Sequence, residues 1–242
     1  MKKALLTTAA VVMVGLFFVG PVAAADVTLG TDIMSAYVWR GITINDGMVI
    51  QPSLDVSYKG FGVNVWSNLD VDDYDGEFES GEFSEVDFTL SYGYDSDRFS
   101  FGVAYAEFLF PGTSTESTRE ISATVDVDIF KGLYAGLGFF YDIDEIDDLY
   151  ASVKIGYAAQ INDQFGLDFS VLCGYANEDW AVANTGTDNG FHDYQLSATA
   201  TYTVIENLDL SVYLNYADSL DDAVLAEQEV DFYGGAGIYY TF

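Results

Sequence analysis

The sequence predicts an all-β protein, a transmembrane antiparallel up-and-down β-barrel of about 12 strands with both termini on the periplasmic side. Three observations predict this fold. Apolar and polar residues alternate with a period of two along most of the chain, and the alternating segments are mostly ten to thirteen residues long. The connections between them alternate between short and long, which is typical of outer-membrane barrels.

The first 25 residues have the layout of a cleaved secretory signal peptide. Lys2 and Lys3 precede the apolar run "ALLTTAAVVMVGLFFV", and the small residues of "PVAAA" follow it. The apolar run is shorter than the roughly 20 residues that a spanning helix needs. We therefore expect a leader at 1–25 and a single outer-membrane barrel domain at 26–242.

The alternation is clear in individual segments. Residues 165–175 place Phe165, Leu167, Phe169, Val171, Cys173 and Tyr175 on one face, against a mostly small or polar opposite face. Twelve such segments are expected, at 27–39, 49–58, 61–71, 84–95, 98–109, 119–129, 133–142, 149–159, 165–176, 192–203, 208–217 and 230–242. Strands of this length exceed the five or six residues usual in soluble sheets and match a tilted crossing of a bilayer.

The connections favour a membrane barrel over a soluble β-sandwich. The short turns are "KG", "SD", "FKG", "INDQF" and "VIEN", and they alternate with long acidic loops such as "VDDYDGEFESGEF" and "ADSLDDAVLAEQE". Aromatic residues lie near strand ends on the face expected to meet lipid, where two aromatic girdles are typical. Examples of these residues are Tyr37, Trp39, Tyr58, Phe61, Tyr92, Phe99, Tyr157, Tyr202, Tyr216 and Tyr240.

The final segment, "VDFYGGAGIYYTF", forms one apolar row that ends at Phe242. We expect this row to face lipid and to close the barrel against the first strand. A terminal aromatic residue after such a row resembles the signal that outer-membrane proteins present to their assembly machinery, which makes that machinery an expected partner through Phe242.

Charge and cysteine content exclude several classes. Residues 26–242 contain six basic and 39 acidic residues, a formal charge of −33, so nucleic acid is excluded as a partner. The 18 Tyr and 18 Phe argue against disorder. A single cysteine, Cys173, excludes an internal disulfide.

The stretch "SAYVWRGITINDGMVIQPSLDVSYKGFGVNVWSN" resembles the start of the TorF (Gcw_chp) family of porins. Tyr37, Trp39, Arg40 and Gly41 carry the resemblance, together with "VNVWSN" at 63–68. The resemblance covers about 40 residues, and Pro52 alone represents a proline–alanine pair expected after the first loop. It implies an outer-membrane barrel that forms a pore.

The residues expected to face the lumen are mostly acidic. The predicted pore-lining residues are Asp55, Asp87, Asp126, Asp168, Lys154 and Asp209, with Asp128 as a further inward carboxylate. A wall of carboxylates attracts cations and repels anions. A lumen without ion selectivity would also be lined by polar residues, because water fills it. Twelve strands leave a passage of roughly 10 Å if no loop fills the lumen.

The rim and loops hold the other candidate residues. Arg40 is expected either to hold the first loop inward by pairing with loop carboxylates or to be a solvated charge at a strand end. Asp72, Asp73 and Asp75 belong to an acidic loop that carries rim charge. The acidic loops lack the spacing of a calcium loop, so no dedicated metal site is predicted, and no cofactor is expected.

His192 is the only histidine and precedes Asp193. Neighbouring strand residues point to opposite faces, which argues against a catalytic pair. Cys173 is expected on the lipid face.

Three functions remain open. The first is a passive diffusion channel for ions or small solutes that favours cations, embedded among outer-membrane lipid and lipopolysaccharide. The second is a closed structural or adhesive barrel that presents acidic, cation-binding loops. The third, an outer-membrane hydrolase, is the least favoured, and the chain is predicted not to be an enzyme.

Overall fold

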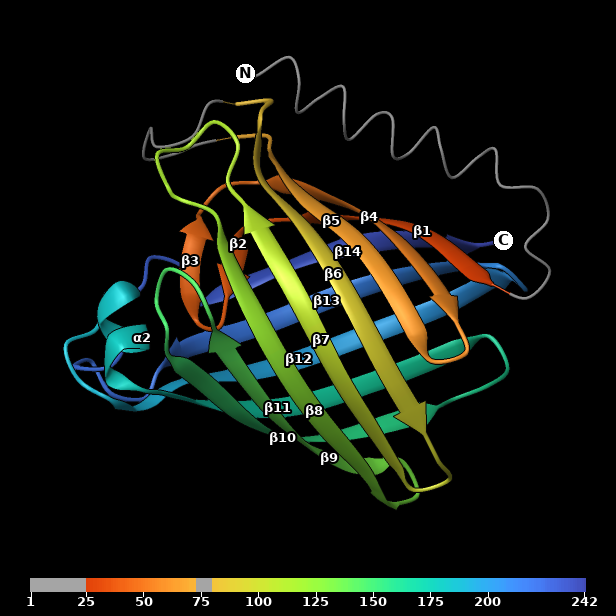
Figure 1. Ribbon diagram of the computed structural model, residues 1–242. Helices are drawn as coiled ribbons and strands as arrows, with labels where there is room; N and C mark the ends of the chain where they lie inside the picture. The colour runs from red at the N-terminus through yellow and green to blue at the C-terminus, as the bar shows by residue number, and fades with distance from the viewer. Residues whose placement is uncertain (1–24, 73–79) are drawn as a thin grey trace.

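The computed structural model describes residues 25–72 and 80–242, and the leader predicted at 1–25 lies outside this part except for its last residue. Twelve antiparallel strands form a closed barrel, in the predicted number and arrangement (Figure 1). In chain order the barrel strands are β1 (Asp26–Met34), β4 (Val49–Tyr58), β5 (Phe61–Asp70), β6 (Phe83–Asp95), β7 (Phe99–Leu109), β8 (Thr118–Phe130), β9 (Leu133–Asp142), β10 (Leu149–Gln160), β11 (Phe165–Ala176), β12 (Gly190–Ile205), β13 (Leu208–Ser219) and β14 (Phe232–Thr241).

Among the described residues, three further elements are not part of the barrel wall. They are the short strands β2 (Tyr37–Trp39) and β3 (Ile42–Asn45), which pair with each other, and the helix α2 (Glu178–Ala183). Within the described residues no helix is long and apolar enough to cross a membrane.

The last strand closes the barrel as expected. β14 pairs with β1 from Thr28↔Thr241 to Met34↔Gly235, and the N–H of Phe242 donates to the carbonyl of Val27 at 2.9 Å. Its apolar row faces outward, since Phe232 and Phe242 are 66% and 64% exposed.

The two ends of the barrel differ as the sequence predicts. The connections at 59–60, 96–98, 131–132, 161–164 and 206–207 are short, and we call their end the turn end. The connections at 35–48, 71–82, 110–117, 143–148, 177–189 and 220–231 are long and lie at the opposite, loop end. In Figure 1 the loop end carries α2, β2 and β3, while the C-terminus lies at the turn end.

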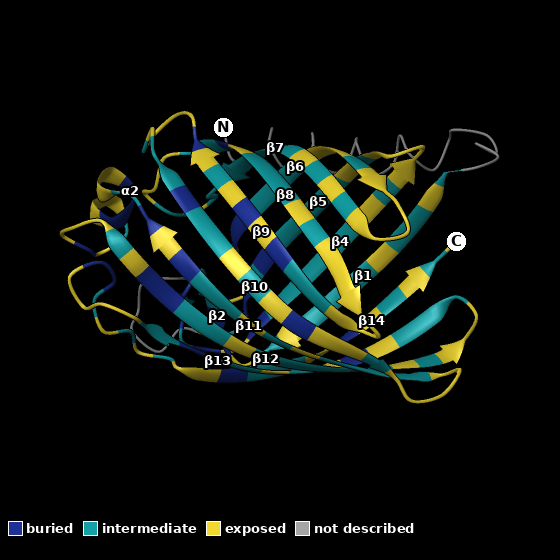
Figure 2. Ribbon diagram, turned by 90° about the horizontal axis from the view of Figure 1, so that it is seen from below, coloured by how far each residue is buried: buried dark blue, intermediate teal, exposed yellow. Residues whose placement is uncertain are grey.

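The barrel wall has an apolar outer surface. Exposed and less exposed residues alternate along the strands (Figure 2), and the exposed ones include Leu90, Ile155 and Val212 at 54–58%. In water this continuous apolar surface would be costly, whereas in a bilayer it contacts acyl chains. The barrel therefore has the fold and the lipid-facing surface of a bacterial outer-membrane protein.

The first strand ends earlier than predicted. β1 stops at Met34, and the chain turns inward instead of continuing to Trp39. Tyr37 is only 9% exposed, and Trp39 packs against Trp180 inside the molecule. The prediction that Tyr37 and Trp39 belong to an outer aromatic girdle is wrong.

Candidate functional site: a plugged lumen

The strand register places the predicted pore-lining side chains on the inner face. The pairs Asp55↔Asn64, Asn64↔Thr89 and Gly136↔Lys154 are examples of the inward set. By the same alternation the inward residues include Asp55, Asp87, Asp126, Asp168, Lys154 and Asp209. Whether these residues line a path for ions stays a prediction.

Side chains from other strands donate hydrogen bonds to three of these carboxylates near the turn end. Asn64 Nδ2 donates to Asp55 at 2.8 Å, Tyr134 Oη donates to Asp168 at 3.0 Å, and Thr203 Oγ1 donates to Asp209 at 2.6 Å.

Lys154 pairs across an intervening strand. Its Nζ lies 3.5 Å from Asp126 Oδ1, and β9 separates the two strands. Gly136 of β9 faces inward between them, and a Cβ at this position would collide with the Asp126 carboxylate. The two side chains are 37% and 42% exposed, so the pair contributes at most about 1 kcal/mol to stability.

Arg40 lies at the tip of a hairpin that crosses the lumen. β2 and β3 form this luminal hairpin (residues 37–45), which leaves the wall after β1. Arg40 Nη1 and Nη2 donate to the two carboxylate oxygens of Glu120 at 2.7 and 2.9 Å. Glu120 belongs to β8, which is on the far side of the closed barrel from β1. Arg40 thus holds the first loop inward, but its partner is a wall residue and not the predicted loop carboxylate.

Aromatic rings surround the Arg40 guanidinium. Its Cζ lies 4.3 Å from the ring centre of Trp39, 4.4 Å from that of Phe140 and 4.8 Å from that of Tyr150. Cation–π attraction adds to the salt bridge because little water reaches the site. Arg40 and Glu120 are only 11% and 7% exposed.

The turn at Arg40 follows from local chemistry. Arg40 and Gly41 have φ of 50° and 80°, and Trp39 pairs directly with Ile42 across the turn. Two central residues with positive φ form the tight turn that joins hairpin strands, and glycine favours it. Lys59–Gly60 has the same geometry between β4 and β5.

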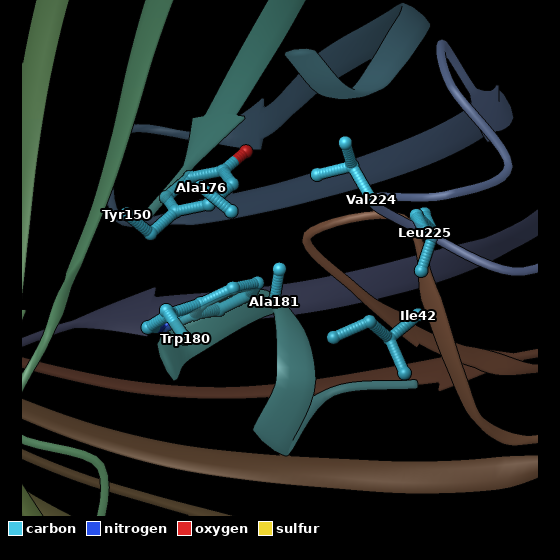
Figure 3. Close-up of a cluster of buried hydrophobic side chains, with 7 residues drawn as sticks. All are labelled: Ile42, Tyr150, Ala176, Trp180, Ala181, Val224 and Leu225. Carbon is cyan, nitrogen blue, oxygen red and sulfur yellow. The ribbon is translucent and has the colours of Figure 1, made fainter. Parts of the chain in front are cut away.

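Two other long loops meet the hairpin. Residues 177–189, which contain α2, and residues 220–231 join residues 35–48 to form a plug, the name used below for these three segments. Their shared apolar cluster comprises Ile42, Tyr150, Ala176, Trp180, Ala181, Val224 and Leu225 (Figure 3). Hydrogen bonds also join the segments, such as Thr43 N–H to Gln228 Oε1 at 2.8 Å.

The plug seals the loop end around nearly the whole circumference. Ten of the twelve barrel strands contribute an inward side chain that is buried at this level: Val49, Asn68, Glu85, Glu120, Asp142, Tyr150, Ala176, Asp193, Ala217 and Tyr233. On β7, Phe108 packs against Trp39 with ring centres 6.3 Å apart. Toward the turn end the lumen is open to solvent, since Asp55 and Asp128 are exposed.

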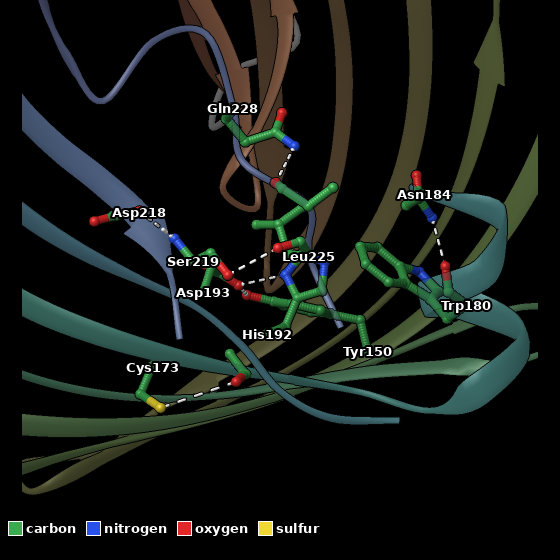
Figure 4. A network of polar contacts seen from close by, with 12 residues as sticks. Tyr150, Cys173, Trp180, Asn184, His192, Asp193, Asp218, Ser219, Leu225 and Gln228 are labelled. Atoms are coloured by element: carbon green, nitrogen blue, oxygen red, sulfur yellow. Dashed lines mark hydrogen bonds and ion pairs between the residues drawn. The ribbon is translucent and has the colours of Figure 1, made fainter. Parts of the chain in front are cut away.

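His192 and Asp193 form a pair, contrary to the prediction. A β-bulge lies at this point, because β11 advances two residues from Cys173 to Tyr175 while β12 advances three, from Tyr194 to Phe191. Both side chains are therefore buried inside, and His192 Nδ1 lies 2.9 Å from Asp193 Oδ1 (Figure 4). Strict alternation of side chains does not hold where the strand carries an extra residue.

The pair is built into the wall beneath the plug. Tyr150 Oη donates to Asp193 Oδ1 at 2.9 Å, and the His192 ring lies 5.0 Å from that of Trp180. Both His192 and Asp193 have 0% exposure, and Gly41 and Gly174 pack directly on Asp193. No substrate can reach the imidazole in this arrangement, so the geometry gives the hydrolase hypothesis no support.

The structure describes one of the three acidic loop residues predicted at the rim. Asp73 and Asp75 lie outside the described residues, whereas Asp72 is exposed at the loop end. Over 25–72 and 80–242, no group of three or more His, Cys, Asp or Glu side chains is placed to hold a metal ion. Cys173 faces outward, as predicted, and is partly buried.

Asp148 anchors α2 to the barrel. Its Oδ2 accepts the N–H groups of Asp179 and Trp180 at 2.9 and 3.2 Å, and its Oδ1 accepts Asn177 Nδ2 at 2.8 Å. Burial alone would raise the pKa of Asp148, but the hydrogen bonds from Asn177, Leu149, Trp180 and Asp179 outweigh it and lower the pKa below its usual value.

We expect this anchor to weaken in acid. A carboxyl whose folded pKa is lowered stabilises the fold above its unfolded pKa of about 3.9 and loses that contribution as the pH falls through the folded pKa. Asp148→Ala should destabilise the docked helix by about 0.5–2 kcal/mol at neutral pH. Hydrogen exchange of the Asp179 and Trp180 amides measures this. Equal exchange in the variant and the wild type at neutral pH would contradict the anchoring role.

Sequence reasoning missed the residues that form the plug. Glu120, Tyr150 and Trp180 received no role, because their partners come from distant segments. One local signal was available: "YVWRGITI" is an alternating pair of short strands around an Arg–Gly turn, equivalent to the Lys–Gly turns identified elsewhere.

The barrel is similar to solved porin structures. A KdgM porin shares 11% identity over 89% of this chain and 99% of its own, with a TM-score of 0.58. The NanC porin shares 13% identity over 90% of this chain and 98% of its own, with a TM-score of 0.53. An outer membrane channel from Pseudomonas putida F1 shares 8% identity over 90% of this chain and 96% of its own, with a TM-score of 0.57.

At these identities the likeness establishes the fold: this chain has the closed antiparallel barrel of outer-membrane porins. No protein-family model matches the sequence, and no curated protein sequence matches it either. The TorF family resemblance therefore stays a prediction.

Proposed function

We propose that the protein is a porin-like channel of the bacterial outer membrane for small solutes and ions, that it favours cations, and that the plug closes it in the present structure. The observation that carries this proposal is the water-accessible acidic lumen that lies behind a plug formed by three connections between barrel strands. The proposal includes TorF family membership, export by the leader at 1–25, periplasmic termini, assembly through Phe242 and contact with lipid and lipopolysaccharide.

The charge of the open part of the lumen supports cation preference. Asp55, Asp126, Asp128, Asp168 and Asp209 lie on its wall, against Lys154 as the one inward base among the described residues. Lys154 is already paired with Asp126. In a narrow passage the remaining carboxylates concentrate cations and raise the barrier for anions.

The same charge bears on the solute class. One solved structure with this fold is a "KdgM porin in complex with disordered oligogalacturonate", at 10% identity and a TM-score of 0.57. Galacturonate units carry carboxylates, which the acidic wall of this chain would repel. We therefore assign cations and neutral solutes to this lumen and not acidic oligosaccharides.

A closed structural barrel is the second candidate, and the plug itself favours it. The apolar cluster and the buried Arg40–Glu120 salt bridge close the loop end more firmly than a loosely folded loop would. In this alternative the barrel presents its acidic loops as a cation-binding or adhesive surface, and no ion crosses.

A variant without the hairpin separates the two candidates. Met34 pairs directly with Val49, so an Asn–Gly turn can replace residues 35–48 and join β1 to β4 without distorting the wall. In a planar bilayer under a KCl gradient, this shortened variant should give steady current with a reversal potential that favours cations. A folded shortened variant without current would contradict the channel and favour the closed barrel.

Selectivity should depend on the inward aspartates. Asp168→Asn and Asp209→Asn in the shortened variant remove two charges, and we expect the reversal potential to move toward zero because less cation accumulates in the lumen. Glu107→Gln is the matched control, since Glu107 lies on the outward set of β7. An unchanged reversal potential in the double variant would contradict the acidic-lumen selectivity.

A further inference from the structure

The wall beside the luminal hairpin contains two inward carboxyls without a basic partner, one buried and one partly buried. Glu85 and Asp87 both face inward from β6, and Glu85 is only 7% exposed. Tyr37 of the hairpin packs against Trp66 with ring centres 5.5 Å apart, and Trp66 pairs with Asp87 across the sheet. Glu85 and Asp87 therefore lie at the contact between the plug and the wall.

Asp87 has surroundings that disfavour a negative charge. Across the sheet it pairs with Trp66 on one side and Phe108 on the other, so two aromatic side chains flank it. Its Oδ1 is buried and has no hydrogen-bond partner. A carboxylate in such a site is stable only if it binds a proton or a cation.

The other buried carboxyls of the plug region differ, because neutral or cationic donors bind them. Asp70 accepts Asn45 Nδ2 and Asn68 Nδ2 at 2.6 and 2.9 Å. Tyr150 donates to Asp193 in the same way. Glu120 holds both guanidinium nitrogens of Arg40, so this arginine is not free to neutralise Glu85 or Asp87.

The charges around the pair therefore add to the repulsion. The titratable or charged groups that face it are Tyr37 and Arg40 from the hairpin, Asp70 from β5 and Glu120 from β8. Arg40 is the single cation of this set and it is already paired. Two neighbouring inward carboxyls with no free cation beside them repel each other when both are ionised.

We propose that the plug is an acid-closed gate: the hairpin stays docked while Glu85 and Asp87 hold a proton between them, and it leaves the β5–β6 wall when both ionise. This inference rests on the proposed channel and adds its regulation. Raising the pH releases the proton, and the two carboxylates then repel each other and draw water into the contact.

The protein carries its own reporter of this motion. Its three tryptophans are Trp39, Trp66 and Trp180. Trp39 stacks near Trp180 with ring centres 5.8 Å apart, and Trp66 lies 5.5 Å from Tyr37. All three contact the hairpin or the plug, so tryptophan quenching by the neutral quencher acrylamide reports plug opening without a label.

The test measures acrylamide quenching and single-channel current of the protein refolded in lipid between about pH 5 and pH 9, the range in which buried carboxyls titrate. Both signals should rise together with pH. For each proton released, the ratio of open to closed plug should increase by up to about tenfold per pH unit. Glu85→Gln combined with Asp87→Asn should stay closed at every pH. Glu107→Gln, which removes a carboxylate on the outward set of β7, should behave as the wild type.

The outcomes separate the gate from the channel. Quenching that does not change with pH, together with current through the shortened variant, would overturn the gate and leave the channel intact. Quenching that rises with pH while the shortened variant stays silent would support the moving plug and overturn the channel. If the double variant fails to fold, Asp87→Asn alone should still weaken the pH dependence, and an unchanged dependence would overturn the gate.

Discussion

Arg40→Gln should undock the luminal hairpin. The substitution leaves Glu120 buried at 7% exposure without a counter-charge and removes the cation from its aromatic site. Loss of one member of a buried ion pair costs about 3–5 kcal/mol. We expect strong acrylamide quenching of Trp39 and Trp180 and a large increase in current at a pH at which the wild type is closed.

Two further variants make this result specific. Arg119→Gln also removes an arginine–carboxylate pair, 2.6 Å from Asp144, but this pair is 41% and 33% exposed and should contribute about 1 kcal/mol or less. Arg40→Gln combined with Glu120→Gln should recover part of the docking, because no lone carboxylate remains. Equal quenching in Arg40→Gln and the wild type would show that the salt bridge does not hold the plug.

Gly41→Val should also undock the luminal hairpin, here through a steric collision. Gly41 has φ of 80°, and a Cβ there would lie 2.6 Å from the Asp193 Cβ and 3.0 Å from a Leu225 methyl group. Left-handed backbone costs a residue other than glycine about 1–2 kcal/mol, and the contact with Asp193 adds to this cost. The tip should no longer fit between the wall and residues 220–231, which thermal unfolding and tryptophan quenching would both detect.

Gly81 provides the matched control. It has almost the same φ, 82°, but a Cβ there meets nothing within 4 Å. Gly81→Val therefore carries the backbone strain without the collision, and it should leave the quenching unchanged. If Gly41→Val behaves like Gly81→Val, the close packing of the hairpin tip against Asp193 is wrong.

The sequence is most informative about the wall of the barrel. Alternation decides which face of each strand meets lipid, because side chains on a strand have a strict period of two. For this reason Asp168 and Asp209 could be placed inward, and the row from Phe232 to Phe242 outward, without a structure. The pairing of Lys154 with Asp126 could not be found, since it depends on the inward Gly136 between them.

The plug could not be predicted from local sequence patterns. Residues 27–39 continue an alternating pattern, yet the strand ends at Met34, and Tyr37 and Trp39 pack inside the lumen against Trp66 and Trp180. The bulge at His192 breaks the period that the prediction used. The partners of Arg40 lie on β8, β9 and β10, and no local pattern contains that information.

The comparison of current through the wild type and the shortened variant, at the same voltage and at acidic pH, tests the central claim most directly. The claim is that the plug closes an acidic barrel and that the luminal hairpin is the segment that holds it closed. We expect the shortened variant to conduct steadily and the wild type to conduct rarely. Equal and steady current through both proteins would show that the luminal hairpin does not close the barrel.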